Sequence, residues 1–178
     1  MDPKGPSVLI SEEAIQARVA ELAHRISTDY SHVEELLLVG ILRGSFIFLA
    51  DLSRRLTIPR RIDFMALASY GHTTTTTGAV RLIMDLRSDI AQTHVLIVED
   101  IVDTGCTLDF LISALRPRKP ASLRTCSLLR KPSRLTKNVQ IDYLGFDIPN
   151  AWVVGYGLDY ADAYRALPYI GIVEPERG

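Results

Sequence analysis

The chain has 178 residues, of which 47% are apolar and 23% are charged, and its formal net charge is −1. This composition is ordinary for one globular domain, the charge gives no signal for a nucleic-acid or anionic-membrane partner, and no apolar run approaches the roughly 20 residues of a membrane-spanning helix. The two cysteines form neither a disulfide framework nor a metal-binding spacing, so we expect a reducing, cytoplasmic location.

An amphipathic helix is predicted to begin after Ser11. The Ser11 side chain can cap a helix start, and the acidic residues Glu12 and Glu13 suit the first turn. Apolar side chains then recur at helical spacing, namely Ile15, Val19, Leu22, Ala23, Ile26 and Tyr30. We interpret this helix as scaffold.

A strand, a turn and a second helix are predicted for residues 36–56. Residues 36–41 form a continuous apolar run typical of a buried strand, and the turn of residues 40–45 contains two glycines and Arg43. A single cation placed where backbone N–H groups converge can hold a pyrophosphate. A solvated arginine in a connecting turn is the alternative for Arg43.

Residues 62–70 and 80–84 are predicted to form two strands joined by a polar loop. The loop contains five consecutive threonines, residues 73–77, which have no apolar face to bury. We expect either a mobile loop or the tip of a long hairpin, with a plain spacer as the alternative.

The most informative stretch is residues 95–108, where a strand, a polar turn and a helix follow one another. An apolar run ends in the two acids Glu99 and Asp100, and Gly105 permits a tight turn before the helical pattern begins. Unpaired N–H groups at a helix start suit a phosphate, whereas adjacent carboxylates suit hydroxyls or a hydrated divalent cation. Both kinds of group together predict a sugar phosphate ligand. An ordinary capped helix after a strand with solvated acids is the alternative.

The last third of the chain alternates short apolar segments with polar turns. Residues 122–129, 141–148, 152–156 and 170–173 are predicted to be strands or extended segments. Lys131 follows the first of these, where a side chain is well placed to reach a ligand, and Trp152 can stack on a flat base. A solvated lysine and a tryptophan of the core are the alternatives.

Residues 95–108 resemble the phosphoribosyl-pyrophosphate (PRPP) signature of the type I phosphoribosyltransferases. The similarity is closest to their purine-salvage branch, the hypoxanthine-guanine phosphoribosyltransferases, and four separated motifs occur in the order of that family. The resemblance implies an α/β fold with a mainly parallel twisted sheet, helices on both faces and a small hood. It further implies one domain over residues 1–178, a flexible lid at about residues 69–80, and a hood built from the N-terminal segment and about residues 131–178.

The same resemblance implies a role for individual residues. Contacts to PRPP and its phosphates are implied for Leu42, Arg43, Gly44, Glu99, Asp100, Asp103, Thr104, Gly105, Cys106 and Thr107, with a cis peptide bond before Arg43. Purine contacts are implied for Lys131, Trp152, Val153 and Asp159, and lid contacts for Ser69 and Tyr70. Asp103 would act as the catalytic base and Arg165 would neutralise pyrophosphate, while Glu99, Asp100 and Asp159 would bind Mg²⁺. Relatives often carry an acid before the purine-binding lysine, whereas this chain has Arg130.

The expected reaction is the Mg²⁺-dependent transfer of a 5-phosphoribosyl group from PRPP to N9 of hypoxanthine or guanine, giving IMP or GMP and pyrophosphate. A lysine donor at the purine 6-oxo group would disfavour adenine. Two alternatives stay open: a xanthine-preferring enzyme, and a pyrimidine-operon RNA-binding regulator of the same fold. The regulator would need a basic face, which the net charge does not favour. The resemblance also implies a homodimer or homotetramer without nucleic acid or membrane as a partner.

Overall fold

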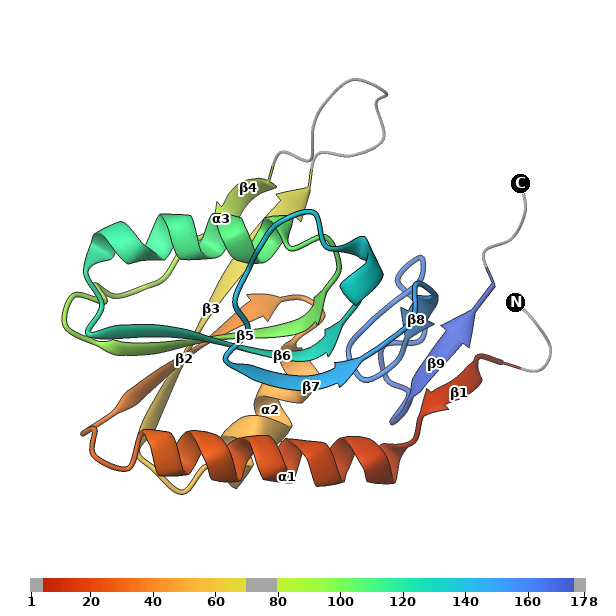
Figure 1. Ribbon diagram of the computed structural model, residues 1–178, viewed down its shortest axis with the longest axis horizontal. Helices are drawn as coiled ribbons and strands as arrows, with labels where there is room; N and C mark the ends of the chain where they lie inside the picture. The colour runs from red at the N-terminus through yellow and green to blue at the C-terminus, as the bar shows by residue number, and fades with distance from the viewer. Residues whose placement is uncertain (1–4, 70–79, 175–178) are drawn as a thin grey trace.

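A six-stranded sheet forms the centre of the protein, as seen in a computed structural model that describes residues 5–69 and 80–174 (Figure 1). The strand order is β4-β3-β2-β5-β6-β7, and every neighbouring pair is parallel except the antiparallel pair β3 and β4. The strands are β2 (Leu36–Leu42), β3 (Arg60–Ser69), β4 (Val80–Met84), β5 (His94–Val102), β6 (Ser122–Arg130) and β7 (Tyr143–Asp147). This arrangement confirms the predicted mainly parallel sheet.

Helices cover both faces of this sheet (Figure 1). Helices α1 (Glu12–Asp29) and α2 (Phe46–Arg55) pack on one face, and α3 (Cys106–Leu115) packs on the other. Ser11 caps α1, because its hydroxyl oxygen accepts a hydrogen bond from the Ala14 N–H at 3.3 Å. Two short 3₁₀ helices, η1 (Arg116–Arg118) and η2 (Pro132–Arg134), follow α3 and β6. No helix among the described residues is long and apolar enough to cross a membrane.

The two hydrophobic cores follow from the alternation of side chains along the central strands. In β5, Leu96 and Val98 pack with α1 and α2, whereas Val95 and Ile97 pack with α3. A parallel strand buried on both faces must be apolar at successive positions, which is why it forms a continuous apolar run in the sequence.

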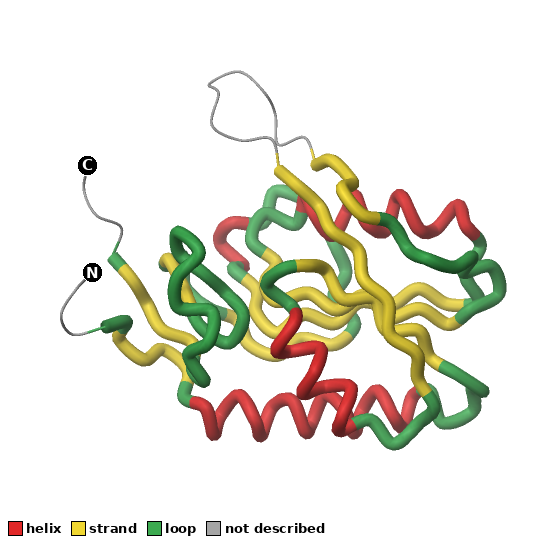
Figure 2. Tube along the Cα trace, turned by 180° about the vertical axis from the view of Figure 1, so that it is seen from behind, coloured by secondary structure: helices red, strands yellow, loops and turns green. Residues whose placement is uncertain are grey.

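A second, antiparallel sheet forms the hood in the order β1-β9-β8 (Figures 1 and 2). It joins β1 (Ser7–Ile10) near the start of the chain to β8 (Trp152–Val154) and β9 (Ile170–Val173) near its end. The hood boundary differs from the prediction, because β7 lies within residues 131–178 but pairs in parallel with β6 in the large sheet. Strand β1 had not been predicted as a strand.

The expected lid lies mostly outside the described residues, and so does Tyr70. Ser69 and Val80 bound this segment and pair with each other as the end of β3 and the start of β4.

Candidate active site

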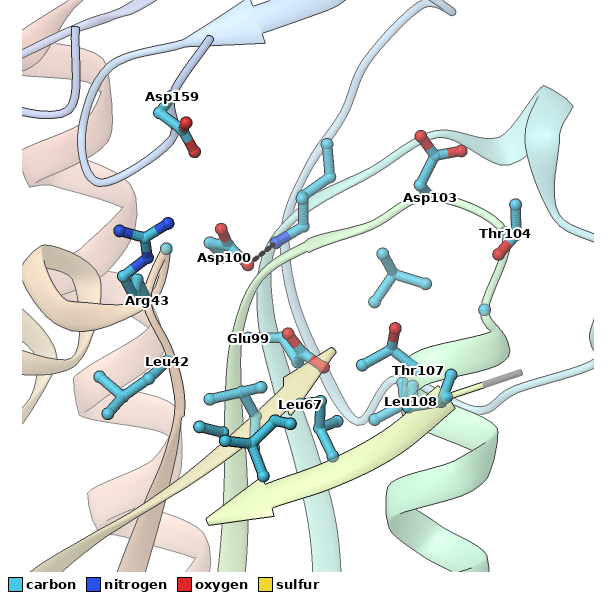
Figure 3. A pocket seen from close by; sticks show the side chains of 18 of the residues that line it. Leu42, Arg43, Leu67, Glu99, Asp100, Asp103, Thr104, Thr107, Leu108 and Asp159 are labelled. Atoms are coloured by element: carbon cyan, nitrogen blue, oxygen red, sulfur yellow. Dashed lines mark hydrogen bonds between the residues drawn. The ribbon is translucent and has the colours of Figure 1, made fainter. Parts of the chain in front are cut away.

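A cavity of about 530 Å³ opens at the carboxyl ends of the central parallel strands (Figure 3). Its walls come from the turn after β2, from β3 and β4, from the end of β5 through the start of α3, and from the loop between β8 and β9. The predicted site residues that line it are Leu42, Arg43, Gly44, Glu99, Asp100, Asp103, Thr104, Gly105, Thr107, Asp159 and Arg165. Residues far apart in the sequence therefore meet at the edge of the sheet where ligands bind in open α/β folds.

The polar turn before α3 has the geometry of an anion site. Gly105 lies directly before the first residue of α3. Its φ of 85° is in the left-handed region, which favours glycine. A Cβ at Gly105 would lie 3.1 Å from Val139 and 3.2 Å from Lys137, so the segment after η2 packs against the turn. That segment also donates backbone hydrogen bonds from Thr136 and Lys137 to the Thr104 carbonyl, at 3.0 and 3.2 Å. The first N–H groups of a helix have no acceptor within the helix, and Thr104, Gly105 and Thr107 at the start of α3 line the cavity.

Glu99 and Asp100 project to opposite faces of the sheet, since β5 continues through both residues (Figure 3). Glu99 is 5% exposed, and its Oε1 has no hydrogen-bond partner among the described residues. Burial raises the pKa of the Glu99 carboxyl well above its usual value. A buried carboxyl without a partner is unusual and marks a place where a ligand can supply the missing donor.

Asp100 packs directly on the turn after β2. A Cβ at Gly44 would overlap the Asp100 carboxylate, so any larger residue would displace that side chain. Burial raises the pKa of Asp100 to about 6, although the Ile101 N–H and the charge of Arg165 oppose this increase. The Leu42–Arg43 peptide bond is cis, as the resemblance implied.

Two arginines contact two carboxylates of the loop between β8 and β9, which we call the hood loop. Arg165 contacts Asp159 at 2.7 Å and Asp162 at 3.4 Å, and it donates to the Gly157 carbonyl at 2.8 Å. Arg43 contacts the same Asp162 oxygen at 3.0 Å. Among the described residues, no group of three or more His, Cys, Asp or Glu side chains is arranged to hold a metal. Glu99, Asp100 and Asp159, the acids for which the resemblance implied Mg²⁺ binding, all line the cavity.

Asp103 contacts a different cation with each of its carboxylate oxygens. The Lys131 Nζ lies 3.3 Å from Oδ2, and the Arg134 Nε lies 2.5 Å from Oδ1. The Lys131 side chain is 9% exposed, so the solvated-lysine alternative does not apply. Arg130 is directed elsewhere and forms a two-point contact with Asp147 at 2.6 and 2.8 Å.

Of the predicted purine residues, only Asp159 lines the cavity, whereas Lys131, Trp152 and Val153 do not. Trp152 is 61% exposed, which excludes the alternative of a core tryptophan. Its ring meets that of Tyr160 edge to face, with the centroids 6.2 Å apart, whereas Val153 is buried. Cys106 also lies outside the lining, with its Sγ 3.8 Å from the Thr136 hydroxyl.

Sequence reasoning missed two charged residues that contact the site residues from outside the cavity lining. Arg134 had a local signal, because it follows Lys131 by three residues across a proline-containing turn that brings both side chains to one side. Asp162 had none, because its contact with Arg43 depends on the tertiary packing of the hood loop.

This combination of a parallel sheet, a phosphate-binding turn and opposed acids and cations defines a phosphoribosyltransferase site, and the family model for the phosphoribosyl transferase domain matches residues 9–161. The chain is 50% identical over 174 residues to the hypoxanthine-guanine phosphoribosyltransferase of Mycobacterium tuberculosis strain H37Rv, covering 95% of this chain and 86% of that protein. It is 50% identical over 168 residues to the hypoxanthine phosphoribosyltransferase of Haemophilus influenzae, and this match covers 93% of this chain and 94% of that protein.

Among solved structures, a hypoxanthine-guanine phosphoribosyltransferase from Bacillus anthracis superposes with a TM-score of 0.89 at 44% identity. The match covers 94% of this chain and 98% of that chain. The chain therefore belongs to the hypoxanthine-guanine phosphoribosyltransferase family.

Proposed function

We propose that the chain transfers the 5-phosphoribosyl group of PRPP to N9 of a 6-oxopurine, hypoxanthine or guanine, in a purine-salvage reaction. One observation carries the choice of base: the Lys131 Nζ and the Asp103 Oδ2 lie 3.3 Å apart. They form a donor and an acceptor side by side, which complements the adjacent 6-oxo group and N7–H of such a purine. Adenine would present an amino donor to the lysine, so the pair selects against it.

PRPP would occupy the cavity with its 5′-phosphate at the turn of Thr104, Gly105, Cys106 and Thr107. The N–H groups at the start of α3 support this placement, because they need an acceptor and carry a partial positive charge. The ribose hydroxyls would donate to Glu99 and Asp100, which both line the cavity. The unpartnered Oε1 of Glu99 supports this assignment, since a hydroxyl would satisfy it.

The pyrophosphate would lie against Leu42, Arg43, Gly44 and Arg165. Mg²⁺ usually binds through one or two carboxylates together with waters and substrate phosphates. Asp100 and Asp159 fit that requirement, because the two acids are close enough for the charge of Asp159 to raise the pKa of Asp100. They would hold the ion, which when bound neutralises charge on the leaving pyrophosphate. We assign Glu99 to the sugar rather than to the metal, because it faces the other side of the sheet.

Asp103 would act as the general base. As the N9 lone pair forms the new bond to the ribose C1, the C1–O bond to pyrophosphate breaks and both electrons leave with the pyrophosphate. The N7 proton passes to the Asp103 carboxylate, while Arg43 and Arg165 stabilise the departing charge. Lys131, Val153 and Trp152 would fix the base in plane, so that N9 is directed at C1.

A panel of bases tests this function. Purified protein is mixed with PRPP, Mg²⁺ and one of hypoxanthine, guanine, xanthine, adenine or uracil, and nucleotide formation is measured. We expect turnover of hypoxanthine or guanine, no turnover of adenine or uracil, and loss of activity when EDTA removes the metal. Absence of Mg²⁺-dependent turnover of any 6-oxopurine would contradict the proposal. Preference for xanthine would select the alternative enzyme.

We extend the proposal to the surroundings of the site. Residues 69–80 would close over the bound substrates and exclude water, with Ser69 and Tyr70 at the start of the lid. The enzyme would be a cytoplasmic homodimer or homotetramer. Protection of residues 69–80 from proteolysis by bound substrates would test the lid, and sedimentation would test the assembly.

A further inference from the structure

Two cations contact the Asp103 carboxylate, one at each oxygen. A general base needs a free oxygen for the proton, so its role alone does not explain two such contacts. Arg134 contacts Oδ1 at 2.5 Å, and Lys131 contacts Oδ2 at 3.3 Å. Among the described residues, these two cations are the hydrogen-bond partners of the Asp103 side chain. Each oxygen therefore has its own partner, and the orientation of the carboxylate is fixed.

The two cations are presented by one short and well-anchored turn. Helix η2 begins with Pro132, and the Arg134 N–H donates to the Lys131 carbonyl at 3.1 Å. The turn is tied to the end of β5, directly before Asp103, because the Lys131 N–H donates to the Val102 carbonyl at 3.0 Å. Arg134 is thus attached to the same part of the backbone as the carboxylate it contacts.

The two contacts of Asp103 should respond differently when a purine binds. Lys131 is buried beside the place of the 6-oxo group and would exchange Oδ2 for that oxygen. Oδ2 would then be free to accept the N7 proton. Arg134 does not line the cavity and has no comparable ligand, so its contact with Oδ1 would persist.

We propose, on the basis of the function proposed above, that Arg134 is a positioning residue for the catalytic base. It holds Oδ1 and keeps Oδ2 directed at N7 after Lys131 has moved to the purine. A general base must lie within hydrogen-bond distance of the proton it removes, and the Asp103 side chain is 39% exposed, so without Arg134 it would sample other rotamers. The planar guanidinium suits this task because it fixes direction as well as charge.

The test compares Arg134→Ala, Arg134→Lys and a control, Arg118→Ala, in single-turnover formation of IMP from hypoxanthine. Single turnover is used because product release often limits kcat in enzymes with lids. Arg118 is a matched control, since it makes a two-point contact with Asp85 at 2.9 and 2.8 Å outside the cavity lining. We expect Arg134→Ala to lower the rate about tenfold with the Kd of PRPP unchanged, Arg134→Lys to recover part of it, and the control to match wild type.

A double-mutant cycle with Asp103→Asn distinguishes positioning from a general structural effect. If Arg134 acts through the base, Arg134→Ala should lower the rate no further once the carboxylate has been removed. An equal loss in both backgrounds would overturn the assignment, as would a single-turnover rate within about twofold of wild type. A parallel loss of PRPP affinity would instead make Arg134 a substrate-binding cation, which also overturns it. Failure of the proposed function is distinguished by the wild-type enzyme, which would then not form IMP at all.

Discussion

The Asp100 carboxyl should make the ligand-free protein less stable as the pH rises. Its pKa is about 6 in the folded chain, compared with a usual value of 3.8, chiefly because it is buried. When the folded pKa of a carboxyl is raised, the stability it contributes is present below the unfolded pKa and is lost as the pH rises through the folded pKa. The difference between the two values corresponds to about 3 kcal/mol at pH 8. For a chain of this size, that is about 6–12 °C in Tm.

Asp100→Asn removes the charge but keeps an oxygen that can accept from the Ile101 N–H, a bond of 2.9 Å in the wild type. In thermal unfolding with EDTA and without PRPP, the Tm of the variant at pH 8 should exceed that of the wild type by up to about 6–12 °C. The gain should shrink as the pH falls from 6 to 4, while PRPP turnover is lost. Asp109→Asn, at a half-exposed acid of α3, is the control and should show no such trend. A gain that is equal at pH 8 and pH 4, or a wild type that is the more stable at pH 8, would refute the reasoning.

Three further substitutions test the site directly. Lys131→Met should raise the KM of hypoxanthine at least ~10-fold while the Kd of PRPP stays the same, because the purine loses a donor and PRPP does not. Equal losses of affinity for hypoxanthine and PRPP would indicate a structural lysine. Asp103→Asn should lower kcat by ~10²-fold or more with PRPP binding kept, and near wild-type kcat would remove Asp103 from the role of base. Gly44→Ala should abolish PRPP binding, measured by calorimetry, because the new Cβ overlaps the Asp100 carboxylate; retained affinity would show that the turn can move.

Much of the fold was predictable because its signals are local. The buried strands of residues 36–41 and 95–98 were evident as apolar runs, and Gly105 marked the turn before a helix. Strand β1 was missed because four residues carry little pattern, and its stability depends on pairing with β9 at the other end of the chain. Contacts made by such distant segments have no counterpart in local spacing.

The placement of the two adjacent acids shows where sequence reasoning stops. The apolar run of residues 95–98 indicated a strand with Glu99 and Asp100 at its carboxyl end, and β5 in fact continues through both acids to Val102. The period of two along a strand directs their side chains to opposite faces, and the charge of Asp159 acts on Asp100. Local spacing could not predict that contact, because Asp159 comes from the distant loop between β8 and β9.

The charges of the ligand-free site are arranged so that substrates exchange partners with the protein. Arg43 and Arg165 are paired with carboxylates of the hood loop, and Lys131 is paired with Asp103. The Lys131 side chain is 9% exposed, and a buried cation without a partner would be strongly destabilising, so Asp103 stabilises it until a substrate replaces the carboxylate. The pair of Arg43 and Asp162 is exposed on both sides and contributes little to stability. Glu99 is the opposite case, because it lacks a donor and gains one only when a ligand binds. Substrate binding should therefore exchange existing contacts at the arginines and add a new one at Glu99, while the arginines neutralise the charge that develops on the leaving group.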